Sequence, residues 1–144
     1  MITNYDIEKN LYRSLKAEFV RPSTPLVGHT YIGGMVYNGD RPLNSQDEDI
    51  TVKTIATSGD GFPQYSTVNI NIYVPDLAEN HGGFVRNGKR LAELSKAVVD
   101  LVETFNYPNT ATFVESQTEI PLDAVKQHYM NIRVRVDIYA EINQ

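Results

Sequence analysis

The stretch from Gly83 to Arg90 comes closest to a motif with defined chemistry. Its sequence, GFVRNGKR, has the glycine and lysine spacing of a phosphate-binding loop, G-x-x-x-x-G-K-[ST], and it precedes an expected helix. The last position of that motif supplies a hydroxyl group to magnesium, and Arg90 stands there instead. Phe84 and Val85 would also form a poor phosphate cradle. We therefore interpret the stretch as a loop that enters a helix whose basic residues face solvent.

Three potential metal ligands, Asp76, Glu79 and His81, lie close together in the segment 75–83. Carboxylates and imidazoles are common ligands of divalent metals. Their spacing, however, matches no established ligand pattern. We interpret the segment as a hydrated polar loop and predict no metal site, and a small metal- or ligand-binding domain that uses residues 76–81 is the alternative.

The acidic run Asp47-Glu48-Asp49 and the histidines are the remaining chemical candidates. No calcium-loop spacing follows the acidic run, so we interpret it as a solvated strand entry or an interface. His29, His81 and His128 are far apart in the sequence, and no Ser-His-Asp arrangement or G-x-S-x-G elbow accompanies them. We expect His128 to be a satisfied histidine at the start of the last strand. The sequence predicts no catalytic residue, no cofactor and no enzymatic activity.

The composition is that of an ordinary soluble domain. A chain of 144 residues with 41% hydrophobic and 22% charged residues suits a single domain with its own core, spanning residues 1–144. The net charge of −5 disfavours binding to a phosphate backbone. The absence of cysteine excludes disulfides, thiol catalysis and thiolate metal sites. No apolar run is long enough for a membrane span, and the N-terminus lacks the layout of a signal peptide, so we expect a cytosolic protein.

Apolar periodicity predicts two helices and five strands in the order α-β-β-β-α-β-β. A period of four in Ile7, Leu11, Leu15 and Phe19 predicts a first helix that is capped at Thr3 and ends before Pro22 and Pro25. The second helix is expected at about 85–105, with Leu91, Leu94, Val98, Leu101, Val102 and Phe105 as its buried stripe. Strands are expected at about 29–37, 49–57, 66–74, 110–119 and from 128 onward. These elements predict an α+β fold, a mainly antiparallel sheet with both helices packed on one face.

Two glycine-containing segments predict local geometry. Gly33-Gly34 indicates a bulge or a close approach of two backbone segments. Asn38-Gly39 indicates a turn, but Pro42 argues against a tight hairpin. We therefore interpret residues 38–47 as a projecting loop between two strands.

The final strand alternates between apolar and polar residues almost to the end of the chain. At about 3.3 Å per residue it would reach roughly 50 Å, whereas a compact globule of this length is roughly 37 Å across. The strand should therefore bend or run past its own domain onto another molecule. Its polar face carries Arg133, Arg135, Asp137 and Glu141. This face is either solvated or an intersubunit surface on which arginines pair with carboxylates of a neighbour.

Three segments are distinctive: YNGDRP (37–42), NSQDEDITV (44–52) and VNINIYVPD (68–76). With the element order and the size of the chain, they resemble tail terminator or tail completion proteins of long-tailed bacteriophages and prophages. The resemblance implies a structural protein without catalytic residues. It would form a ring, typically hexameric, that caps the tail tube and joins it to the head, with the tail tube protein and the head–tail connector as partners. The protein would occupy the host cytoplasm during assembly and then the virion tail.

The same resemblance implies that the 38–47 loop reaches a neighbouring subunit or the tube, and that DNA passes through an acidic lumen without sequence-specific contacts. The predicted interface residues are Arg41, Asp47, Glu48, Asp49, Arg133, Arg135, Asp137 and Glu141. A head–tail connector or a tube subunit would be a structural protein of the same class, and the sequence does not separate them from a terminator. A generic dimeric adaptor is a further alternative.

Overall fold

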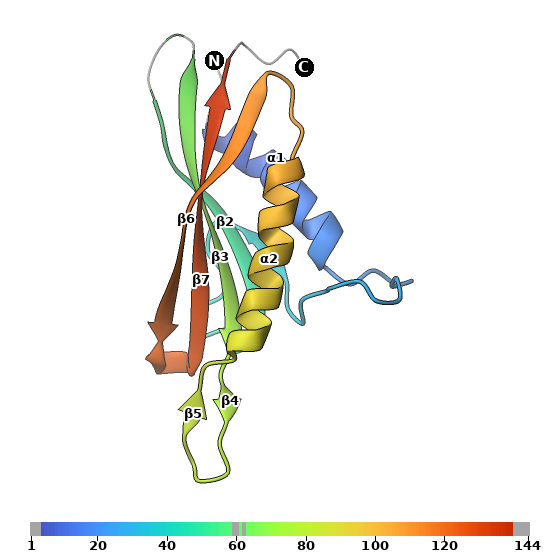
Figure 1. Cartoon of the computed structure of the whole chain (residues 1–144), viewed down its shortest axis with the longest axis vertical. Helices are drawn as coiled ribbons and strands as arrows, with labels where there is room; N and C mark the ends of the chain where they lie inside the picture. Colours follow the sequence, from blue (N-terminus) through green and yellow to red (C-terminus); the bar gives the residue numbers. More distant parts are fainter. Residues whose placement is uncertain (1–3, 59–60, 62, 140–144) are drawn as a thin grey trace.

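The structure, a computed structural model, describes residues 4–58, 61 and 63–139. It is the predicted α+β fold, with helices α1 (Asn4–Phe19) and α2 (Gly88–Thr104) on one face of a five-stranded sheet (Figure 1). The sheet contains β1 (Val36–Asn38), β2 (Asp49–Thr57), β3 (Gln64–Pro75), β6 (Thr110–Leu122) and β7 (Gln127–Ile138). A separate hairpin is formed by β4 (Leu77–Ala78) and β5 (Phe84–Val85), and the 3-10 turn η1 (Asp123–Val125) joins β6 to β7.

The core lies between the two helices and one face of the sheet. In α1 the predicted residues Ile7, Leu11, Leu15 and Phe19 are all buried, and in α2 the buried stripe is Leu91, Leu94, Val98 and Val102. Both stripes belong to one apolar cluster with the alternating side chains of β2, β3 and β7. The predicted core is thereby confirmed, except that Leu101 and Phe105 are only partly buried. The predicted cap at Thr3 lies outside the described residues, and none of the helices within these ranges is long and apolar enough to cross a membrane.

The final strand lies inside the sheet. The strand order is β1-β2-β3-β7-β6, and β7 pairs antiparallel with β3 on one side and with β6 on the other along its whole length. It has 12 residues, as β3 does, and β6 has 13. We predicted that this strand bends or runs past its domain. Its described part does not run past the sheet, because neighbours of similar length pair with it on both sides. Residues 140–144, which would continue it, lie outside the described part.

The first strand is much shorter than predicted, and it runs parallel to the next strand, which determines the path of the loop between them. Only β1 forms, apart from an isolated bridge between Val20 and Ile32, and β1 runs parallel to β2. A parallel connection cannot turn back directly, so the chain must cross over a face of the sheet. Residues 39–48, which we call the crossover loop, run over the face that the helices leave open. The predicted loop is held to the sheet by Arg41, which lies over the Tyr73 ring, whereas most of its other residues, Leu43 among them, are exposed.

The segment predicted as a polar loop forms a hairpin that extends beyond the end of the sheet (Figure 1). We call residues 76–86 the arm. Leu77 pairs with Val85 and Ala78 with Phe84, and the backbone N–H of Glu79 donates to the carbonyl of Gly83 at 2.8 Å. The arm is therefore an ordered projection with regular strand pairing.

Candidate functional site

The open face of the sheet carries a groove of about 600 Å³ between the crossover loop and η1. We define the groove by six of its lining residues: Leu43, Lys53, Ile55, Asn69, Tyr73 and Tyr129. Burial, and then the charge of nearby Tyr73, raises the pKa of Tyr129, so this phenol is neutral at physiological pH. Within the described part of the chain, Oδ1 of Asn69 is buried and has no hydrogen-bond partner. The groove thus combines two tyrosine rings with the exposed apolar side chains Leu43 and Ile55.

A buried polar cluster holds the crossover loop against this face. The Arg41 guanidinium donates to Oδ2 of Asp49 at 3.3 Å and to Oε1 of Gln127, and it lies 3.7 Å from the centre of the Tyr73 ring. Asp49 also accepts from the Ser45 hydroxyl at 2.7 Å and from the backbone N–H of Met35 at 2.9 Å. The side chains of Arg41 and Asp49 are only 9% and 1% exposed. Each charge is compensated inside the molecule, which a buried ion pair requires.

A second ion pair connects the acidic run to α2. Arg90 donates from Nε and Nη2 to the two carboxylate oxygens of Glu48 at 2.9 and 2.8 Å, and Nη2 also donates to the carbonyl of Tyr31 at 2.6 Å. The hydrogen bond to Glu48 raises the pKa of Arg90. Asn87 caps the helix by accepting from the backbone N–H of Arg90 at 3.2 Å. Arg90 therefore connects helix and loop, which corrects the expectation that this basic residue faces solvent.

These contacts revise the interpretation of the acidic run. The side chain of Asp47 is exposed, but Glu48 and Asp49 are bonded internally, so the picture of a solvated strand entry is wrong for these two residues. In this conformation Arg41 and Asp49 offer almost no surface to a partner. The interface role of Asp47 and Glu48 stays a prediction.

The three ligand candidates of the 76–81 segment do not converge. Asp76 forms an ion pair with His128, whose Nδ1 lies 2.7 Å from Oδ1 of Asp76, at the base of the arm. Glu79 and His81 are exposed farther along the arm. No group of three metal-ligating side chains occurs in the described ranges. His128 has a hydrogen-bond partner within the chain, as expected. This partner, Asp76, lies 52 positions away, and no local sequence pattern indicates such a pair.

The polar face of β7 is partly satisfied within the chain. Arg135 donates to Asp137 at 2.6 Å and lies 4.2 Å from the centre of the Tyr65 ring, and the hydrogen bond to Asp137 raises the pKa of Arg135. Arg133 is exposed, and it forms no salt bridge with any residue that the structure describes. The remaining predicted interface residue, Glu141, lies outside the described residues.

The register places Asn69 between two cations. It is aligned with Lys53 of β2 on one side and with Arg133 of β7 on the other. Lys53 has an exposed partner, Asp40, at 3.7 Å. Of the two cations beside Asn69, only Arg133 is therefore without a salt bridge to a residue that the structure describes.

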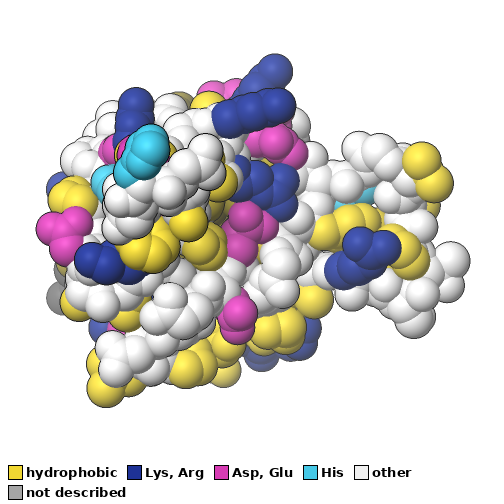
Figure 2. All heavy atoms as spheres, turned by 90° about the horizontal axis from the view of Figure 1, so that it is seen from below, with side chains coloured by type: hydrophobic (Ala, Val, Ile, Leu, Met, Phe, Trp, Pro, Cys, Tyr) yellow, Lys and Arg dark blue, Asp and Glu magenta, His cyan; other side chains and the backbone are white. Residues whose placement is uncertain are grey.

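The arm carries the exposed apolar surface that sequence reasoning missed. Residues 77–86 are all exposed, including Leu77, Phe84 and Val85, and Phe84 is 52% exposed. Figure 2, which views the molecule from this end, shows hydrophobic side chains at the surface among charged ones. The sequence signal for this surface is the adjacent apolar pair Phe84-Val85 in an otherwise polar segment.

No protein-family model matches the chain, and no curated protein matches it.

Proposed function

We propose that this chain is a non-enzymatic structural subunit that assembles with copies of itself into a closed ring of the tail terminator type. The observation that carries the proposal is the arm, a projecting hairpin with apolar side chains on both of its faces. Leu77 and Val85 lie on one face, and Ala78 and Phe84 lie on the other. A two-stranded hairpin is marginally stable in water, and clustered exposed apolar groups mark sites of association. We therefore expect a partner to cover the arm.

The sequence segments that resemble tail terminators support the specific type of assembly. Residues 37–42 and 44–52 form the end of β1, the crossover loop and the start of β2, while residues 68–76 form β3 and lead into the arm. The resemblance therefore lies in the parts that build the groove and support the arm. The tail tube protein and the head–tail connector are the proposed partners, and the ring would leave a passage for DNA.

The test is to identify the assemblies that the full chain forms alone and with tail tube protein. Native mass spectrometry and negative-stain electron microscopy should detect rings with a fixed copy number, typically six, and rings at the ends of tubes. The tubes alone, which should grow to variable lengths, are the control. A protein that forms at most dimers and leaves tube ends bare would overturn the proposal and favour the adaptor alternative.

A further inference from the structure

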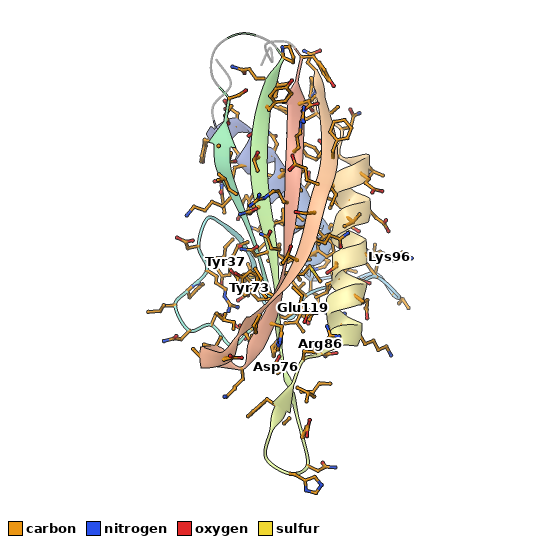
Figure 3. All side chains as sticks on the ribbon, turned by 60° about the vertical axis from the view of Figure 1, so that its left-hand side comes forward. Tyr37, Tyr73, Asp76, Arg86, Lys96 and Glu119 are labelled. Carbon is orange, nitrogen blue, oxygen red and sulfur yellow. The ribbon has the colours of Figure 1, made fainter. Side chains whose placement is uncertain are left out.

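We propose that the arm of one copy docks in the groove of the next copy, so that the subunits join head to tail. This inference rests on the proposed function and specifies which surfaces meet. The arm and the groove are neighbours at one end of the sheet but do not share residues: the arm leaves the end of the sheet beyond Asp76, whereas Tyr73, three residues earlier, lies within the sheet beside the crossover loop (Figure 3). No arm residue lines the groove of its own subunit, so each subunit presents both halves of the contact unpaired.

The groove offers the kind of surface that the arm needs. Leu43 and Ile55 are 92% and 50% exposed at its edge, and the rings of Tyr73 and Tyr129 lie in contact, with centres 5.0 Å apart. A volume of about 600 Å³ corresponds to roughly 20 water molecules at about 30 Å³ each. Apolar side chains of the arm would release this water and cover both exposed surfaces, which favours association.

Charge complementarity favours the groove over a second cavity in the described structure. In the arm, Asp76 pairs with His128 and Arg86 with Glu119, which leaves Glu79 as the described arm carboxylate without an ion pair. Lys53 in the groove is paired with Asp40, which also lines it, whereas the exposed Arg133, aligned with Asn69 beside the groove, has no salt bridge with any described residue. Arg133 is therefore the cation available to Glu79. The second cavity, of about 460 Å³, is lined by Glu18, His29 and Asp100, and its two carboxylates would repel Glu79.

The resulting contact is heterologous, because two different patches of the same chain meet. Such contacts generate rings when the rotation between subunits closes, and open filaments when it does not. Head-to-tail docking is therefore compatible with the proposed ring. It also predicts that an arm defect and a groove defect can complement each other when they are placed in different chains.

The test uses the absence of cysteine from the chain, so that introduced thiols are the only ones present. A Val85→Cys chain is mixed with an Ile55→Cys chain under mild oxidation, and disulfide-linked dimers are measured by non-reducing electrophoresis. In the matched control, Lys96→Cys, on the exposed side of α2, replaces the groove cysteine (Figure 3). We expect at least a tenfold higher yield with the groove site. Leu43→Cys is a second groove site, and circular dichroism checks that each variant is folded.

A charge reversal makes the test more specific. Glu79→Lys in the arm chain should reduce the cross-linking yield several-fold, and Arg133→Glu in the groove chain should restore it. Equal yields at the groove and at Lys96→Cys, or no response to charge reversal, would overturn the docking inference.

The two proposals can fail separately. Rings formed by the wild-type chain without groove-specific cross-links would leave the proposed function standing and remove this interface. Groove-specific cross-links in a protein that forms no ring would retain the interface and remove the ring.

Discussion

The crossover loop and the arm both connect strands, but they differ in which side chains they bury and which they expose. The crossover loop buries Arg41 and Asp49 against the sheet and compensates both charges within the chain. The arm leaves the sheet and exposes Leu77, Phe84 and Val85 to solvent. Charged groups are thus enclosed by one connection, although its Leu43 is 92% exposed, while the arm exposes apolar groups on both of its faces. The crossover loop is fixed by contacts within the chain, and the proposal that another molecule covers the arm starts from this difference.

The difference follows from the partners that each segment meets within the chain. The crossover loop passes over Tyr73 and Gln127, which offer a ring face and an amide to Arg41. The arm extends past the end of the sheet and has few such neighbours. Its base is held by the Asp76–His128 pair and by a hydrogen bond from the backbone N–H of Asp76 to the carbonyl of Lys126 at 2.9 Å. The arm is therefore anchored at its base and exposed along its length.

The largest expected effect is the loss of the buried carboxylate in Asp49→Ala. This change leaves Arg41 buried without its counter-ion, and breaking a buried pair in this way costs about 3–5 kcal/mol. We expect a correspondingly lower free energy of unfolding, measured by urea titration followed by circular dichroism. The matched control is Asp47→Ala, which removes an exposed carboxylate two residues away and should change stability by less than about 0.5 kcal/mol. Equal effects of the two substitutions would show that the buried cluster does not hold the loop.

An intermediate effect is expected for Gly34→Ala, which tests the close packing beneath the end of the crossover loop. A Cβ atom at position 34 would lie 2.5 Å from the carbonyl oxygen of Glu48 and would also overlap the Asp49 carboxylate. Overpacking of this kind costs about 1–3 kcal/mol. Gly33→Ala is the control, because a Cβ atom there has no neighbour within 4 Å. The same unfolding experiment measures both, and a neutral Gly34→Ala would show that the loop can move away at no cost.

The smallest effect on stability is expected for the arm. The double substitution Leu77→Ser with Val85→Ser alters exposed side chains and should change the free energy of unfolding by less than about 0.5 kcal/mol per site. Sedimentation velocity should nevertheless show weaker self-association or weaker binding to tubes. A large loss of stability with unchanged association would reverse the comparison, since the arm would then serve its own fold.

Much of the fold could be predicted from periodicity, because burial of one face imposes a regular spacing on each element. The predicted bounds of β2 are those observed, and Val68, Ile70, Ile72 and Val74 of β3 are buried as expected. Gly34 makes the close approach that we predicted for the glycine pair. The strand predicted at 29–37 is mostly irregular, because tertiary contacts, and not local propensity, decide where pairing begins.

The sequence by itself determined the helices, the long strands and the apolar face they share, since periods of two and of about four residues leave few other ways to bury that surface. The tertiary structure alone decided that β1 runs parallel to β2, that Arg41 meets Asp49 and Gln127, and that Arg90 meets Glu48. It also decided that Arg41 holds residues 38–47 to the sheet while the arm projects. These outcomes depend on contacts between residues far apart in the chain, and periodicity carries no information about which distant groups will meet.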